Sequence, residues 1–158
     1  MRLLIVRHAD AEPHTTTDAD AGRALTPKGV RKMHRVAAGL AALDLSLDRI
    51  ETSPWTRAAQ TAELLRPLLH GECVANPLLA APPDGELLRG LGGYSVALVG
   101  HEPWLGELVG LLVCDPDGPV TPLPLRKGGV AWLEGEPRPG GMALVAFLPP
   151  RVIRRVEA

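Results

Sequence analysis

The chain has 158 residues and a mass of 16.8 kDa, which suits one domain whose core needs no disulfide or metal. Its 17 basic and 18 acidic residues leave a formal net charge of −1, so no overall positive field would gather nucleic acid or an anionic membrane. We therefore expect a single domain over residues 1–158 with no nucleic-acid or membrane partner. Any anion site must be built from local residues.

The sequence also predicts a cytoplasmic protein. Arg7 interrupts the first apolar run too early for the core of a signal peptide, and later apolar runs are far shorter than the ~20 residues of a membrane span. Cys73 and Cys114 lie far apart in the sequence and have no metal-ligand spacing. This spacing argues against a disulfide framework and against a zinc site, so no metal is expected.

Apolar runs and helix signals alternate along the chain. Residues 2–6, RLLIV, are almost continuously apolar, which is typical of a strand covered on both faces. In order, the patterns predict a strand at 2–6, a loop at 9–25, a helix at about 27–43, a strand at 48–53, a helix from 56 that stops near Pro67, a strand at 72–76, a short helix at about 84–91, a strand at 94–101, a helix at 103–113, and an antiparallel pair at 128–136 and 142–150. The basic tail 151–155 is expected to be a solvated end, with guidance of an acidic protein partner as the weaker alternative.

Alternating strands and helices predict an α/β fold, a three-layer α/β/α sandwich with a mostly parallel central sheet. In such a fold ligands bind in the crevice at the carboxyl ends of the strands. Arg7 and His8 follow the first strand, His101 follows the strand at 94–101, and Arg57 begins the second helix. We therefore expect these four side chains to meet at one edge of the sheet.

Two arginines and two histidines without metal spacing favour a phosphate site. Arginine presents a planar fork of donors to phosphate oxygens and stays charged at any working pH. Positive surroundings disfavour the imidazolium form, leaving a neutral ring whose free nitrogen can attack phosphorus. His8 is the expected nucleophile, Arg7 and Arg57 the expected phosphate ligands, and His101 the expected donor to the transferring phosphoryl group.

Three motifs also carry a family resemblance. RHADAEP at 7–13, SPWTRAAQTA at 53–62 and VGHEP at 99–103 together resemble the histidine phosphatase superfamily, also called phosphoglycerate mutase-like. The resemblance implies a phosphoglycerate mutase-like α/β sandwich, a phosphorylated histidine at His8, phosphoryl ligands at Arg7, Arg57 and His101, and no cofactor.

The short chain, the RHADAE opening and the pattern of Asp18 or Asp20, Arg23 and LTPKG are similar to SixA-type phosphohistidine phosphatases within that superfamily. Larger relatives carry a catalytic carboxylate in an insertion after the second helix, where this chain has only PPDGELLRG. Asp84 and Glu86 in that segment are candidate acids. Glu102, after His101, is a third candidate, although it equally suits a helix N-terminus.

Two further side chains are weaker candidates for substrate binding. His14 lies where mutase-like relatives often have a polar phosphate ligand, but a loop histidine can equally be solvated. Arg23 is expected to pair with Asp18 or Asp20 more than to touch phosphate directly.

Three functions stay open at this point. The first is a metal-independent phosphatase that acts through a phosphohistidine intermediate on phosphohistidine carried by a protein. An alkoxide needs a proton from an acid as it leaves, whereas an imidazole protonated on its second nitrogen leaves as a neutral molecule. This difference would explain why the chain has no clear general acid. The second is a phosphatase of small phosphomonoesters, such as sugar phosphates or nucleotide-derived metabolites. The third is a phosphate-binding module without turnover. The oligomeric state is not indicated by the sequence.

Overall fold

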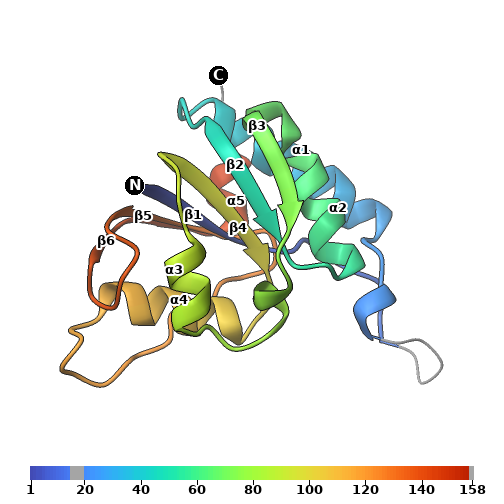
Figure 1. The fold of residues 1–158 in the computed structure, drawn as a ribbon. Helices are drawn as coiled ribbons and strands as arrows, with labels where there is room; N and C mark the ends of the chain where they lie inside the picture. Colours follow the sequence, from blue (N-terminus) through green and yellow to red (C-terminus); the bar gives the residue numbers. More distant parts are fainter. Residues whose placement is uncertain (15–19, 157–158) are drawn as a thin grey trace.

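The computed structural model describes residues 1–14 and 20–156. Strands and helices alternate through most of the chain (Figure 1). The elements are β1 (Arg2–Arg7), the 3₁₀ turn η1 (Asp20–Gly22), α1 (Pro27–Ala41), β2 (Leu47–Thr52), α2 (Thr56–Leu64), the 3₁₀ turn η2 (Arg66–Leu68), β3 (Leu69–Ala75), the 3₁₀ turn η3 (Pro77–Ala80), α3 (Gly85–Gly90), β4 (Ser95–Gly100), α4 (Trp104–Val113), β5 (Val130–Gly135), β6 (Met142–Leu148) and α5 (Pro150–Ile153).

The strands form one six-stranded sheet in the order β3-β2-β4-β1-β5-β6. The first four strands in this order run parallel, whereas β5 and β6 are antiparallel to their neighbours. The predicted α/β fold with a mostly parallel sheet is confirmed. Because the carboxyl ends of β1, β2 and β4 meet at one edge, the residues that follow these strands are brought together there.

Helices cover both faces of the sheet and create two apolar layers (Figure 1). Leu4 and Val6 of β1 join the core beneath α1, α2 and α5, whereas Leu3 and Ile5 join the core beneath α3 and α4. These four side chains are at most 1% exposed. The continuous apolar run therefore arises because alternate side chains of a central strand are buried on opposite faces.

The termini of several elements differ from the sequence expectation. The first helix ends at Ala41 instead of about residue 43, and the third strand begins at Leu69 instead of residue 72. The tail expected to be solvated contains α5, and its Ile153 is fully buried against α1. Close contact with Gly39 allows this packing, because a Cβ there would lie 2.1 Å from the Ile153 carbonyl oxygen. That residues 1–158 form a single domain stays a prediction.

In the part of the chain that the structure describes, no helix has both the length and the apolar character to cross a membrane.

Candidate active site

The carboxyl edge of the sheet brings His8 and His101 together. Arg7 at the end of β1 pairs in register with Gly100 at the end of β4, so the next residue of each strand leaves the sheet at the same level. The His8 amide donates to the Gly100 carbonyl oxygen at 3.1 Å. As a result the two imidazole centroids lie 5.2 Å apart, and the side chains are only 5% and 2% exposed.

The contacts of His8 agree on one tautomer. Arg57 Nε lies 3.2 Å from His8 Nε2, and a guanidinium can only donate, so Nε2 must be the unprotonated nitrogen. His8 Nδ1 lies 2.8 Å from the Ala9 carbonyl oxygen, which can only accept. The ring therefore carries its proton on Nδ1, and its lone pair is at Nε2, where it accepts the Arg57 Nε–H.

Arg57 is held at the start of α2, on the first turn after β2. Its Nη1 donates to the Asp20 carbonyl oxygen at 2.6 Å, and its Nη2 donates to an Asp20 carboxylate oxygen at 2.9 Å. Thr61, one turn further along α2, accepts from the Ala9 amide and donates to the Arg57 carbonyl oxygen. These bonds fasten α2 to the segment after β1. An Asp20 carboxylate oxygen thus accepts from one of the two N–H groups of Arg57 Nη2.

His101 is fixed through the opposite nitrogen. Its Nε2 lies 2.8 Å from Ser53 Oγ, and Ser53, fully buried at the end of β2, also accepts from the Trp55 amide. The Trp55 ring packs 4.5 Å from the His101 ring and lies 4.7 Å below the Arg57 guanidinium carbon. Trp55 thus contacts a histidine and an arginine of the same cluster. The Trp104 ring lies farther from His101, at 6.3 Å.

Arg7 enters the cluster from the last residue of β1. Its Nη1 donates to the Leu125 carbonyl oxygen at 2.7 Å. Leu125 is held in turn by Glu102, whose Oε1 accepts from the Leu125 amide at 2.8 Å while Oε2 accepts from the Gly106 amide at 3.3 Å. The segment before β5 is therefore tied to the same edge through Glu102 and Arg7.

Burial and positive charge keep both histidines neutral. Burial above all, together with the charges of Arg57 and Arg7, lowers the pKa of His8 to about 4. Burial and the Arg57 charge lower the pKa of His101 to about 3. Both rings are therefore uncharged near neutral pH. Burial raises the pKa of the Glu102 carboxyl, but both of its oxygens already accept backbone N–H groups.

Two buried nitrogens of the cluster have no protein partner among residues 1–14 and 20–156. They are Arg7 Nε and His101 Nδ1. A third buried nitrogen without a hydrogen bond, Arg2 Nε at the start of β1, lies 3.5 Å from a Glu134 carboxylate oxygen. Buried polar groups are nearly always hydrogen-bonded, so each unpaired one calls for a specific explanation. An anion held between the arginines and histidines would accept hydrogen bonds from both atoms of the cluster.

The remaining predicted residues lie outside these contacts. His14 is exposed, and Asp18 lies outside the described residues. Arg23 pairs with Asp20 at 2.6 Å, as expected, and so supports the Asp20 carboxylate that holds Arg57. Asp84 caps α3 by accepting from the Glu86 and Leu87 amides, and Glu86 is exposed on the same turn. Their roles in substrate binding or acid catalysis remain predictions.

Sequence reasoning missed Ser53 as a partner of His101 and Leu125 as a partner of Arg7. Ser53 carried a usable signal, because it is a polar residue directly after a strand that ends beside the predicted site. Leu125 carried none, because it acts through its backbone carbonyl. Among the residues described, no group of three histidine, cysteine, aspartate or glutamate side chains is arranged to hold a metal ion.

Comparison with known proteins shows the family of the chain. The model of the histidine phosphatase superfamily (branch 1) matches residues 3–80. An uncharacterized protein of Picosynechococcus sp. is 34% identical over 84% of this chain and 84% of its own length. The phosphohistidine phosphatase SixA of Escherichia coli is 30% identical over 69% of this chain and 72% of its own length.

Solved structures agree with the sequence matches. The structure of the protein histidine phosphatase SixA complexed with tungstate has a TM-score of 0.81 and 26% identity, and the match covers 96% of this chain and 98% of that one. The chain belongs to the histidine phosphatase superfamily and is an enzyme of the hydrolase class, a histidine phosphatase. Within the superfamily it is similar to SixA.

Proposed function

We propose that the chain removes the phosphoryl group from phosphohistidine on a protein, without a metal ion, through a phosphohistidine intermediate at His8. One observation carries the proposal: two independent contacts, from Arg57 and to Ala9, leave the lone pair of His8 on Nε2. This nitrogen lies beside two arginines and a second neutral histidine, which is the chemistry that an in-line attack on a phosphoryl group needs.

In the first step His8 Nε2 forms a bond to phosphorus as the bond from phosphorus to the substrate nitrogen breaks. Arg7 and Arg57 offset the charge of the phosphoryl oxygens, and His101 donates from Nδ1 when the Ser53 hydroxyl donates to its Nε2. The substrate imidazole leaves as a neutral molecule because its other nitrogen carries a proton. No side-chain acid is needed for this leaving group.

In the second step water attacks phosphorus, the bond to His8 Nε2 breaks, and phosphate is released. His8 returns to its neutral form with the proton on Nδ1. The phosphoryl group now leaves from an imidazole again, so the same positive surroundings serve both steps. The SixA resemblance supports this substrate class, because the relative carries phosphohistidine phosphatase in its name.

The test compares rates of phosphate release from a phosphohistidine-bearing carrier protein and from a panel of phosphomonoesters, both in the presence of a chelator. Faster release from the phosphohistidine protein is expected. Preference for an ester would contradict the proposed substrate, and no release from either would favour a phosphate-binding module. Release that ceases when metal is chelated would contradict the metal-independent mechanism.

Small phosphomonoesters are the second candidate substrates. The role of Glu102 distinguishes this function from the phosphohistidine phosphatase proposed above. An alkoxide needs a proton as it leaves, and the raised pKa of the half-buried Glu102 favours a carboxyl that can give one. The two backbone bonds to its oxygens favour a bracing role instead. We expect Glu102→Gln to lower the ester rate by less than about tenfold, whereas loss of a general acid would cost about a hundredfold or more.

The partner of a phosphatase is a phosphorylated molecule. That this molecule is a protein carrying phosphohistidine is part of the proposal. The cytoplasmic location stays a prediction from the sequence.

A further inference from the structure

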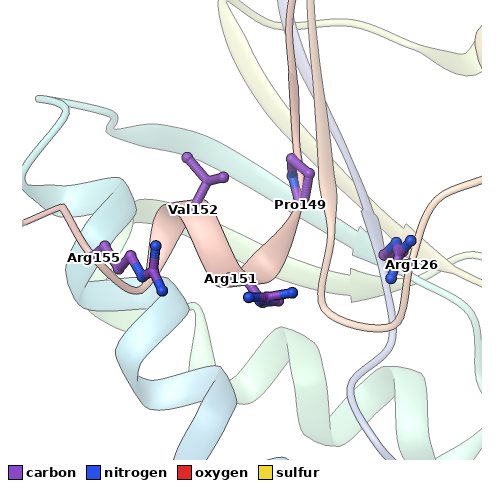
Figure 2. Close-up of a pocket in the computed structure, with 5 residues that line it drawn as sticks. All are labelled: Arg126, Pro149, Arg151, Val152 and Arg155. Atoms are coloured by element: carbon purple, nitrogen blue, oxygen red, sulfur yellow. The ribbon is translucent and has the colours of Figure 1, made fainter.

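A groove lined by arginines lies between the segment before β5 and the α5 turn. Its lining residues are Arg126, Pro149, Arg151, Val152 and Arg155, and its volume is about 330 Å³. In Figure 2 Arg151 lies between Arg155 on one side and Arg126 on the other. We call these five residues the arginine groove. A water molecule takes up about 30 Å³, so the groove admits several side chains at once.

The charge of the arginine groove is uncompensated in the described part of the chain. Arg126, Arg151 and Arg155 are exposed, and none is within ion-pair distance of a carboxylate of residues 1–14 or 20–156. Lys127 and Arg154 line the adjoining hollow. Because the whole chain has a net charge of −1, this concentration of cations is a local feature and not a reflection of overall basicity.

The fold holds the groove in place. Ile153 is fully buried under α5, and Arg35 of α1 donates to the Arg154 carbonyl oxygen at 3.3 Å. The Arg154 amide donates to the Pro150 carbonyl oxygen and the Arg155 amide to the Val152 carbonyl oxygen, so a hydrogen-bonded turn follows α5. Arg151 and Arg155 are four residues apart, which places them on one side of this turn.

The groove lies beside the candidate active site. Gly128, two residues after Arg126, donates its amide to the Arg7 and His8 carbonyl oxygens at 3.0 and 3.1 Å. The hollow that adjoins the groove is lined by Ala9 and Asp10 from the segment after His8, as well as by Pro150 of α5. A molecule that reached from the groove across this hollow would therefore approach the edge where His8 leaves the sheet.

We propose that the arginine groove binds an acidic segment of the polypeptide that carries the phosphoryl group. This inference rests on the proposed function, because it assigns the docking surface of that protein substrate. Arginine forks match carboxylates in a bidentate geometry. Val152, 52% exposed, and Pro149 add an apolar contact suited to residues interspersed among the acidic ones.

Other polyanions fit less well. The groove has no aromatic lining residue on which bases would stack. α5 has four residues and one exposed aliphatic side chain among the lining residues, too little apolar surface to lie in a lipid interface. An acidic polypeptide can pair its carboxylates with the arginines and pack apolar side chains against Pro149 and Val152.

The first test measures binding without turnover. A fluorescein-labelled polyglutamate peptide is titrated with the wild-type protein and with the triple variant Arg126→Gln, Arg151→Gln, Arg155→Gln, and anisotropy is recorded at low salt. The matched control is Arg66→Gln, Arg89→Gln, Arg138→Gln, which removes the same charge from exposed positions outside the groove. We expect the groove variant to raise the Kd at least ~10-fold and the control to change it less than ~2-fold.

Equal binding by the wild-type protein and the groove variant, or no binding by either, would overturn the proposal. So would tighter groove-dependent binding of a single-stranded RNA or of phosphatidylserine vesicles than of the peptide.

The second test is kinetic. The groove variant should raise KM for a phosphohistidine-bearing protein at least ~5-fold and leave kcat/KM for a small phosphoramidate unchanged.

An unchanged KM for the protein would overturn the assignment of the groove to substrate docking. Failure of the proposed function has a different signature. In that case the wild-type protein would not release phosphate from the phosphohistidine protein, and the peptide titration would still decide what the groove binds.

Discussion

His8 and His101 directly follow the neighbouring parallel strands β1 and β4, yet their rings are held through opposite nitrogens. His8 donates from Nδ1 to a backbone carbonyl and presents Nε2, whereas His101 is bound at Nε2 by Ser53 and leaves Nδ1 unpaired. Burial and pKa are similar for the two rings. The strand thus fixes where each histidine lies, and the hydrogen-bond partner fixes which nitrogen is available to a substrate.

The largest expected effect comes from His8. The variant His8→Asn keeps an amide that can donate to the Ala9 carbonyl oxygen but removes Nε2, the nitrogen that we propose attacks phosphorus. We expect turnover to fall at least about 10⁴-fold and the alkali-stable phosphoenzyme to disappear in radiolabelling. His34→Asn, an exposed histidine on α1, is the control and should retain both. A His8→Asn variant that still forms the phosphoenzyme would contradict the assignment of His8 as the phosphorylated residue.

His101→Asn should have a smaller effect, because it removes the proposed donor to the phosphoryl oxygens and leaves the proposed nucleophile, His8, in place. We expect kcat to fall about 10²- to 10³-fold, with a phosphoenzyme that still forms slowly in rapid-quench experiments. Abolition of the phosphoenzyme together with an intact fold by circular dichroism would instead make His101 as essential to the attack as His8.

The low pKa of each ring predicts a stability that depends on pH. The unfolded chain protonates its histidines near pH 6.5, whereas folded His8 and His101 protonate only near pH 4 and 3. Within this window the unfolded state binds more protons, so the free energy of unfolding falls as the pH falls from about 6.5 towards 4. His8 alone corresponds to about 3 kcal/mol.

Urea unfolding at about pH 7.5 and about pH 4 measures this difference. The double variant His8→Asn, His101→Asn is the control, since carboxylates that also titrate in this range are the same in both proteins. The loss of stability on acidification should be clearly smaller in the variant. An identical loss in the two proteins would mean that the rings are not held neutral.

Ser53→Ala should give the smallest effect and sharpen the comparison most. It removes the hydroxyl that orients His101 but no group that contacts the phosphoryl oxygens. Loss of one neutral hydrogen bond is worth about 1 kcal/mol, so we expect kcat to fall about 5- to 10-fold with KM unchanged. Ser46→Ala, at an exposed serine, should leave both unchanged. A change in KM alone would show that Ser53 acts on binding instead.

The parts that could be predicted from the sequence are those that depend on chain periodicity and on residue type. The β1 run, the parallel strands and the meeting of Arg7, His8 and His101 follow from apolar patterns that stop at polar pairs. Ser53 could have been inferred from its place after β2. The tautomer of His8 could not, because it depends on which ring nitrogen faces the Arg57 guanidinium and which faces the Ala9 carbonyl oxygen.

The segment at the end of the chain shows a second limit. The sequence predicts a solvated end at 151–155 because three of these five residues are arginine. Composition does not reveal that Ile153 packs against Gly39. Gly39 offered no signal of its own, since a glycine within a helical pattern more often indicates weak helix propensity than close packing.

The central position of β1 sets an order of events during synthesis. β1 is bonded on one side to β4 and on the other to β5, so both neighbours are made after residue 94. The segment 3–80 that matches the family model contains β1, β2 and β3 but neither strand that pairs with β1. β1, which His8 follows directly, therefore completes its pairing in the sheet only after both β4 and β5 have been synthesised.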